Sequence, residues 1–235
     1  MHRKLLVASL AFLSLACTPN RESVKQEPLE ASVVEKPPVI SGRKEKLRPT
    51  SGMQQALRQQ KAIIDSLFEV ELKDTLLTSR RKKFQVWVKH PETGELTQVV
   101  NNKWPEEVET TFNFFMDDQG RIIRISEMPY SESGDWDMMF SHYFTAEGTT
   151  FAFEKQVSAF NTYCPNDEYP DGITREKAIH LYSPSFTLID STYKMTDDED
   201  KDITTRKCEL EVDSETQVYR NLSSYLAAAK LKFNK

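Results

Sequence analysis

Between residues 51 and 70 the hydrophobic positions recur at the spacing of an α-helix, in the segment SGMQQALRQQKAIIDSLFEV. The apolar side chains fall mostly on one stripe, which consists of Met53, Ala56, Leu57, Ile63, Ile64, Leu67 and Phe68. The opposite face carries Gln, Arg, Lys and Asp, so we predict an amphipathic helix that packs on a sheet. Binding to a membrane surface is the less favoured alternative, because the polar face is not predominantly basic.

From residue 82 onward the period changes to the alternation of β-strands, in short segments separated by turn residues. Four hairpins are expected, with turns at PETG, DDQG, TAEG and SPS, and a ninth strand, TTRKCELEV, follows them. A closing helix is predicted to begin with a capping box at Ser214–Gln217 and to continue through Val218, Leu222, Tyr225, Leu226 and Ala229. The expected fold class is therefore α+β: an antiparallel meander of about nine strands packed with an N-terminal and a C-terminal helix.

Three of these hairpins look like weak internal repeats. FFMDDQGRIIRI, HYFTAEGTTFAF and HLYSPSFTLIDS each join paired aromatic or apolar residues, a tight polar turn and an apolar strand. In the third unit Pro184 and Ser185 are expected to replace the glycine of the turn. Each turn should fix the register of its own hairpin.

The first sixteen residues have the pattern of a secretory signal peptide. MHRK is basic, and it precedes an apolar run from Leu5 to Leu15 that ends in the small residue Ala16. A membrane-spanning helix would need about twenty apolar residues, more than this run provides. An ordinary export signal cleaved elsewhere is the remaining alternative.

The stretch Leu13-Ser14-Leu15-Ala16-Cys17 resembles the lipobox of bacterial lipoproteins. The usual box has leucine three residues before the cysteine and then a small residue, whereas this chain has Ser14 and Leu15 at those places. The resemblance implies cleavage before Cys17, diacylglycerol on its sulfur and attachment to the bacterial cell envelope. Thr18 at the next position implies sorting to the outer membrane, facing the periplasm or the cell surface.

The expected domain organisation has three parts: a signal peptide (1–16), a lipidated cysteine with a disordered tether (17–48), and a single α+β domain (49–235). The tether contains Glu, Lys, Pro and Ser but no aromatic residue. It therefore cannot bury enough apolar area to offset the entropy of ordering. The folded part resembles uncharacterised envelope lipoproteins built from hairpins of the form yFDxxGxI, through FFMDDQGRII and HYFTAEGTTFAF. That resemblance implies no known activity.

The cysteine count is odd, with Cys17, Cys164 and Cys208. If Cys17 carries lipid, two cysteines remain, and a pair in an oxidising envelope usually closes. We therefore predict a disulfide between Cys164 and Cys208, with two free thiols as the alternative. Cys164 has no histidine partner in a nucleophile motif, so a catalytic cysteine is not expected.

Charge argues against nucleic acid as a partner. The net charge is −5, and loss of Arg3 and Lys4 with the signal peptide lowers it to −7. Nucleic-acid binding needs a clustered basic face. The one dense basic run, residues 80–83, leads into an apolar strand and is interpreted as a solvated strand entrance.

Three groups of residues suggest chemistry, and for each a structural role is favoured. His142 and His180 occupy matching places in two repeats and would form part of a zinc site only if their strands paired. The acidic run with Asp198, Asp200, Asp202 and Glu209 imitates a calcium loop, but Ile203 stands where that loop requires glycine. Glu127 and Glu154 could be a carboxylate pair of a glycosidase, although neither their face nor their separation is defined by the sequence.

We therefore predict no catalytic residue, no metal ligand and no cofactor. The favoured hypothesis is a non-enzymatic, lipid-anchored envelope protein that works by binding or scaffolding. Its partners would be the membrane, through the anchor, and an envelope protein or an apolar ligand. One alternative is a carrier of lipid or another apolar ligand in a curved sheet, and another is an envelope hydrolase.

Overall fold

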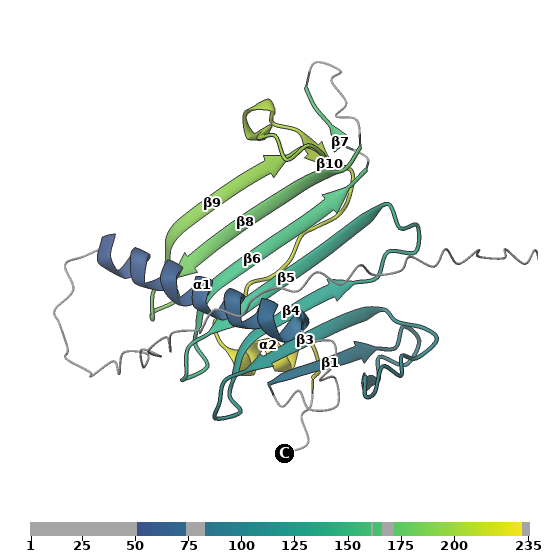
Figure 1. Ribbon diagram of the computed structural model, residues 1–235, viewed down its shortest axis with the longest axis vertical. Coiled ribbons are helices and arrows are strands. Elements are labelled where there is room, and N and C mark those ends of the chain that lie inside the picture. The colour runs from purple at the N-terminus through teal and green to yellow at the C-terminus, as the bar shows by residue number, and fades with distance from the viewer. Residues whose placement is uncertain (1–50, 74–82, 161, 166–171, 232–235) are drawn as a thin grey trace, which may run out of the picture. The chain divides into compact units, whose positions relative to one another are not determined.

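The computed structural model describes residues 51–73, 83–160, 162–165 and 172–231. The expected signal peptide, Cys17 and the expected tether lie outside the described residues. The described part consists of a large antiparallel sheet, a small two-stranded sheet and two α-helices, which confirms the α+β class (Figure 1). The strands of the large sheet are β1 (Phe84–Lys89), β2 (Leu96–Gln98), β3 (Thr110–Met116), β4 (Ile122–Pro129), β5 (Trp136–Phe144), β6 (Thr150–Ala159), β8 (Thr174–Tyr182) and β9 (Leu188–Thr196).

The large sheet is the predicted meander, with the strand order β2-β1-β3-β4-β5-β6-β8-β9. The four expected hairpins are all present as antiparallel pairs. In the first hairpin the order of the strands is reversed relative to the chain. β1 pairs with both β2 and β3, so the short strand β2 lies at the edge of the sheet. Strands that pair in the sheet are thus close together in sequence. This arrangement was expected, because the turn of each hairpin fixes the register of its two strands.

The two faces of the sheet are distinguished by the helix that covers each one. Phe115 packs in a cluster with α1 (Ser51–Lys73), whereas its neighbour Phe114 packs in a cluster with α2 (Leu222–Ala228). Because successive side chains of a strand point to opposite faces, these clusters lie on opposite sides of the sheet. We call these sides the α1 face and the α2 face.

Helix α1 crosses the strands near the end that carries the β3–β4, β5–β6 and β8–β9 turns, and leaves the other end of this face uncovered (Figure 1). Ile64 and Phe68 are its buried apolar contacts, and the Phe68 ring lies 5.5 Å from that of Phe84. The predicted helix is therefore present and packed on the sheet. Its orientation differs from the expectation, because Ile63 and Leu67 point to solvent.

The closing helix is shorter than predicted. The segment 211–220 contains no helix and runs along the α2 face from β10 (Glu209–Leu210) to α2 (Figure 1). The capping box at Ser214–Gln217 is therefore wrong. The helix is capped instead by Asn221, whose side chain accepts the Ser224 N–H while the Ser224 hydroxyl accepts the Asn221 N–H.

The predicted ninth strand is largely absent. Its first residues form the 3₁₀ helix η2 (Thr204–Arg206), and only β10 is extended, paired with β7 (Thr162–Tyr163) in a separate small sheet. Lys207 between them has a φ of 55°, a left-handed conformation that interrupts a strand. The disulfide Cys164–Cys208 is present, as predicted, and joins the residue after β7 to the residue before β10.

The three repeats share one local geometry. Each has an irregularity in the strand register directly before its turn, between Phe115/Met116, Tyr143/Phe144 and Leu181/Tyr182. The last turn residue has positive φ in all three, namely Gly120 (74°), Gly148 (78°) and Phe186 (65°). Phe186, rather than Pro184 or Ser185, thus takes the place of the glycine, and its ring stacks on Tyr182 at 4.7 Å.

Candidate functional site

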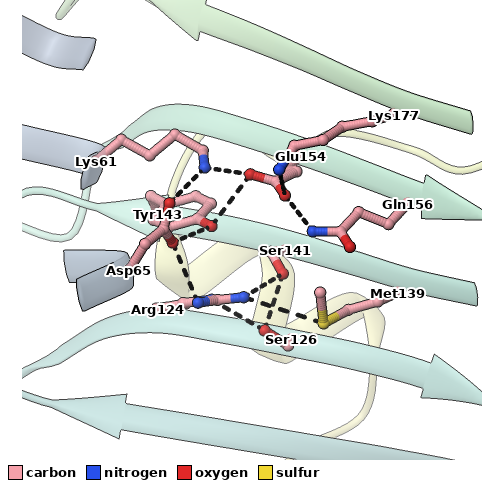
Figure 2. Close-up of polar contacts among 10 residues, drawn as sticks. All are labelled: Lys61, Asp65, Arg124, Ser126, Met139, Ser141, Tyr143, Glu154, Gln156 and Lys177. Carbon is pink, nitrogen blue, oxygen red and sulfur yellow. Dashed lines mark hydrogen bonds and ion pairs between the residues drawn. The ribbon is translucent and has the colours of Figure 1, made fainter. Parts of the chain in front are cut away.

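A buried ionic network lies between α1 and the sheet (Figure 2). Lys61 and Asp65, one turn apart on α1, contact each other at 2.7 Å between Nζ and Oδ2. Lys61 also forms an ion pair with Glu154 of β6, and its Nζ lies 4.6 Å from the centre of the Tyr143 ring. Only 6% of Lys61 is exposed, so this amine depends on its protein partners for solvation.

Glu154 is the centre of negative charge in this network. Its residue is 2% exposed, and it accepts from Lys61, from Gln156 and from Lys177, the last at 2.9 Å. Burial by itself would raise the pKa of Glu154, but the Lys61 and Lys177 ammonium groups outweigh it and lower the pKa to about 2. Glu154 is therefore ionised at all physiological pH values.

Arg124 of β4 forms the second half of the network. Its Nη1 donates to Asp65 at 3.1 Å, its Nε donates to Ser126 at 3.1 Å and its Nη2 donates to Ser141 at 3.3 Å. The guanidinium carbon also lies 3.9 Å from the centre of the Phe68 ring. Arg124 thus joins α1 to two strands at once.

Tyr143 connects the two halves. Its hydroxyl donates to Asp65 at 2.7 Å, and Glu154 lies 3.5 Å away. Burial raises the pKa of Tyr143 well above its ordinary value, and the nearby Glu154 and Asp65 carboxylates raise it further. The phenol therefore stays protonated and acts as a donor.

The network contains three cations, Lys61, Arg124 and Lys177, and two carboxylates, Asp65 and Glu154. Each buried charge has at least one partner of opposite sign, which is the condition for burying it without a large penalty. This mutual pairing favours a structural role, in which the network fixes the position of α1 on the sheet. The adjacent hollow of about 310 Å³ is lined by further charged residues, Arg58 and Asp190, which form an ion pair.

A second candidate site is a cleft of about 700 Å³ on the α2 face, between β6, β8 and β9 and the segment 212–218. Its apolar lining consists of Phe153, Ala178, Val212 and Val218, and its polar lining consists of Lys155, Glu176, His180, Tyr193 and residues 213–216. An apolar floor with a few convergent polar groups is the usual composition of a ligand pocket, and this volume is in the usual range.

One wall of this cleft is held in place by Lys155. Its Nζ contacts Glu176 on the neighbouring strand at 2.6 Å and donates to the Ser214 hydroxyl at 2.9 Å. Val212 and Val218 pack on the sheet at either end of the segment. The strands of the sheet thus form one side of the cleft. The segment 212–218, which Lys155 and the two valines hold against the sheet, forms the other side.

The two histidines of the repeats do not form a ligand pair. His142 of β5 and His180 of β8 are both opposite Phe153 of β6, so the Phe153 ring lies between them. The His142 Nε2 accepts the Tyr219 N–H at 3.3 Å, and burial lowers the pKa of His142 to about 3. His142 is therefore a neutral residue of an aromatic cluster, in agreement with the structural role expected for it.

Glu127 and Glu154 lie on opposite faces of the sheet, which excludes a carboxylate pair. Glu154 belongs to the network under α1, whereas Glu127 accepts a hydrogen bond from Tyr225 of α2 at 3.0 Å. Burial raises the pKa of Glu127, although the Tyr225 hydroxyl and Lys89 oppose this. Among the described residues no cluster of three or more His, Cys, Asp or Glu side chains is arranged to hold a metal ion.

The acidic run forms a solvated loop, as expected. Asp198, Asp200 and Asp202 are exposed, and Glu209 lies in β10. Asp202 accepts the Thr204 N–H at 2.9 Å, and Asp200 has a φ of 62° at the position where the other turns have glycine or Phe186. The acidic run thus contains a turn with the same positive φ at its last residue as the turns of the three repeats.

The sequence did not single out the members of the ionic network, apart from Glu154. A signal was nevertheless present, because Lys61, Ile64, Asp65 and Phe68 follow the spacing i, i+3, i+4, i+7 and so share one side of the helix. On the sheet, Ser126, Ser141 and Glu154 lie directly opposite one another across three strands. Only the strand registers show that these polar positions form one row.

Comparison with known proteins finds no matching family model, no related curated protein and no similar solved structure. Within the part of the chain that the structure describes, neither helix is both long and apolar enough to cross a membrane. The functional argument therefore depends on the geometry of the two sites.

Proposed function

We propose that the protein is a non-enzymatic binding protein of the bacterial cell envelope, anchored through a lipid on Cys17. The observation that carries the binding role is the cleft on the α2 face, with its apolar floor and polar walls. Glu176 and His180 from the sheet and residues 213–216 from the loop offer both donors and acceptors. The ligand is therefore a small polar molecule with one apolar side.

This composition favours a polar ligand over the apolar cargo of a carrier. The space between α1 and the sheet is occupied by Phe68, Ile64 and the ionic network. The hollow beside α1 is lined by Ala62, Ile179, Leu181 and Thr192 and also by five charged side chains, those of Arg58, Lys61, Asp65, Lys177 and Asp190. An apolar ligand would leave those charges without solvent, at a high cost in free energy.

The geometry also favours binding over hydrolysis. Lys61, Asp65, Arg124, Tyr143 and Glu154 do converge from different elements, but they pair with one another. Glu154 has its pKa lowered and Tyr143 has its pKa raised, so neither is poised to exchange a proton near neutral pH.

Native mass spectrometry of the acylated chain, isolated from its own membranes in mild detergent, tests this proposal. We expect a bound small molecule in addition to the mass of the protein and its lipid. Ala178→Trp fills the cleft and should abolish the extra mass, whereas Gln98→Trp on the edge strand β2, at the other edge of the sheet, should retain it. A chain isolated without a bound species, or one whose bound species survives Ala178→Trp, would contradict the proposal.

A further inference from the structure

The two edge strands of the large sheet differ in length. β2, at one edge, has three residues, and a very short edge strand is one of the ways in which proteins prevent a sheet from pairing with another chain. β9, at the other edge, has nine residues and contains no proline. The β9 edge is therefore the edge at which this sheet can be extended.

The C-terminal end of the outer edge of β9 is covered by residues 202–204 of the same chain. The Met195 N–H donates to the Thr204 hydroxyl at 2.9 Å, and the Met195 carbonyl accepts the Ile203 N–H at 2.9 Å. The backbone groups of Met195 therefore point away from β8 and are already bound.

The middle of the same edge is open. Because the direction of the backbone groups alternates along an antiparallel strand, those of Ser191 and Tyr193 point away from β8, as those of Met195 do. Among the residues that the structure describes, no segment pairs with this edge between residues 188 and 194. A second strand could therefore bind along Ser191 and Tyr193.

Pairing of β9 with the β9 of a second copy is possible in few registers, because the two strands must be related by a two-fold axis. An axis at Asp190 would set this carboxylate opposite its own copy, and like charges directly opposite each other destabilise a sheet. An axis at Lys194 would do the same with two ammonium groups. Neither register is favourable.

Two further registers fail on the backbone. An axis at Tyr193 would pair Ser191 with Met195, whose backbone groups are already bound. An axis at Ser191 would pair Tyr193 with Ile189, which has no partner on β8 and forms the bulge of this strand. The register centred on Thr192 has neither defect.

We propose that two copies of this chain pair through β9, in the antiparallel register centred on Thr192, and so form one continuous sheet. Ser191 of each copy then exchanges backbone hydrogen bonds with Tyr193 of the other. On the α1 face, Asp190 lies opposite Lys194 of the second copy, twice by symmetry, and Thr192 lies opposite itself. Opposite charges and threonine pairs in facing positions both stabilise a sheet.

The side chains at this edge are available for these contacts. Lys194 is exposed and forms no ion pair with the other described residues. Asp190 contacts Arg58 of α1 and the N–H of the adjacent Ser191. A carboxylate can accept a second cation beside the first, as Glu154 does for two lysines in this structure.

The rest of the molecule is compatible with this register. The acidic residues 197–202 come opposite residues 183–187 of the second copy, a turn that contains no charged side chain. The first turn of α1 lies beyond β9 (Figure 1). Since the two strands are antiparallel, this turn reaches the part of the second copy's α1 face that its own helix leaves uncovered. The proposal goes beyond the binding role and depends neither on the cleft nor on the anchor.

A cysteine cross-link tests both the occupant and the register, in the full-length chain with Cys17→Ser so that Cys17 does not contribute. In the proposed register the Cβ atoms at position 192 are about 5 Å apart, within the range of a disulfide after a small adjustment. We expect Thr192→Cys to give a covalent dimer after oxidation, with a peptide that joins position 192 of one copy to position 192 of the other. Thr97→Cys on the exposed edge strand β2 is the matched control and should stay monomeric.

Sedimentation velocity of the same Cys17→Ser chain over a range of concentrations measures the dimer without a cross-link. Lys194→Glu sets two carboxylates opposite Asp190 of the other copy, and we expect it to raise the dissociation constant at least about tenfold. Ser191→Pro removes an outward N–H, which an edge strand tolerates, and should weaken the dimer by a different route. The exposed Lys103→Glu should dimerise like the parent chain.

A parent chain that stays monomeric at every concentration would overturn the proposal. Equal cross-linking of Thr192→Cys and Thr97→Cys would do the same, as would a Lys194→Glu variant that dimerises like the parent. Circular dichroism of each variant shows that a loss of the dimer does not reflect unfolding. These measurements use the unacylated chain and report association alone, so their failure leaves the proposed anchor and the proposed ligand cleft unaffected.

Discussion

At the scale of single residues, the contribution of the ionic network to the free energy of unfolding depends on Glu154. Two lysines converge on this carboxylate, one from α1 and one from β8. Removing one partner of a buried ion pair is more destabilising than replacing both, because it leaves an uncompensated charge in a medium of low polarity.

We expect Glu154→Gln to lower the free energy of unfolding by about 3 kcal/mol, measured by urea denaturation at pH 7. The double variant Lys61→Met/Glu154→Gln should lose less than the sum of the single variants, because it removes both charges. The exposed Glu211→Gln serves as control and should change little. A Glu154→Gln variant as stable as the parent would show that the network does not hold α1 on the sheet.

His142 gives the protein a dependence on pH that is separate from that of the carboxylates. Burial lowers the pKa of His142 to about 3 from an ordinary 6.5, so below pH 6.5 the unfolded chain binds a proton that the folded chain refuses. The resulting stability is complete above pH 6.5 and is lost as the pH falls toward 3. Glu154, with its lowered pKa, contributes stability that is lost only below its ordinary pKa of 4.5.

His142→Phe keeps an aromatic ring in this cluster and removes the titration. Between pH 6.5 and 4.5 the parent chain should lose about 2–3 kcal/mol more stability than the variant, from urea denaturation at several pH values. Parallel curves of stability against pH for the two proteins would contradict the neutral, buried state of His142.

At the scale of elements, the sequence predicted the hairpins well because each register depends on a local turn. FFMDDQGRII contains within itself the bulge, the positive φ of Gly120 and the start of β4. The predictions of secondary structure were wrong where contacts with distant parts of the chain determine the local conformation. Residues 214–220 look helical in isolation, but Val212 and Val218 pack along the sheet and Lys155 binds Ser214, which holds the segment extended.

The same reasoning explains the error in the orientation of α1. The spacing in sequence suggests one apolar stripe that contains Ile63, Ile64, Leu67 and Phe68. Of these four side chains only Ile64 and Phe68 are buried. The choice between the two possible faces depends on Arg124 and Glu154, which lie far away in sequence and attract Asp65 and Lys61. No local pattern contains that information.

The repeated turn geometry gives a prediction at this scale. Gly120 has a φ of 74°, and a Cβ at this position would meet nothing within 4 Å, so Gly120→Ala changes only the backbone. We expect a loss of about 1 kcal/mol in the free energy of unfolding, because alanine is strained in the left-handed region. Gln119→Ala in the same turn is the matched control, and equal stabilities of the two variants would contradict the assigned turn.

At the scale of the whole molecule, the sheet separates two faces that carry different candidate sites. The α1 face carries the buried ionic network, and the α2 face carries the cleft. The disulfide Cys164–Cys208 closes a loop with a sequence separation of 44 and stabilises the fold by about 4 kcal/mol. Cys17 is the third cysteine of the sequence, and it is the residue at which we propose lipidation.

We propose that the protein is held at a membrane through Cys17, and metabolic labelling with radioactive palmitate in a bacterial host tests this anchoring most directly. We predict that the unsubstituted chain and Cys164→Ser incorporate the label and that Cys17→Ser does not. Labelling that persists in Cys17→Ser, or an unsubstituted chain that remains unlabelled, would contradict the account.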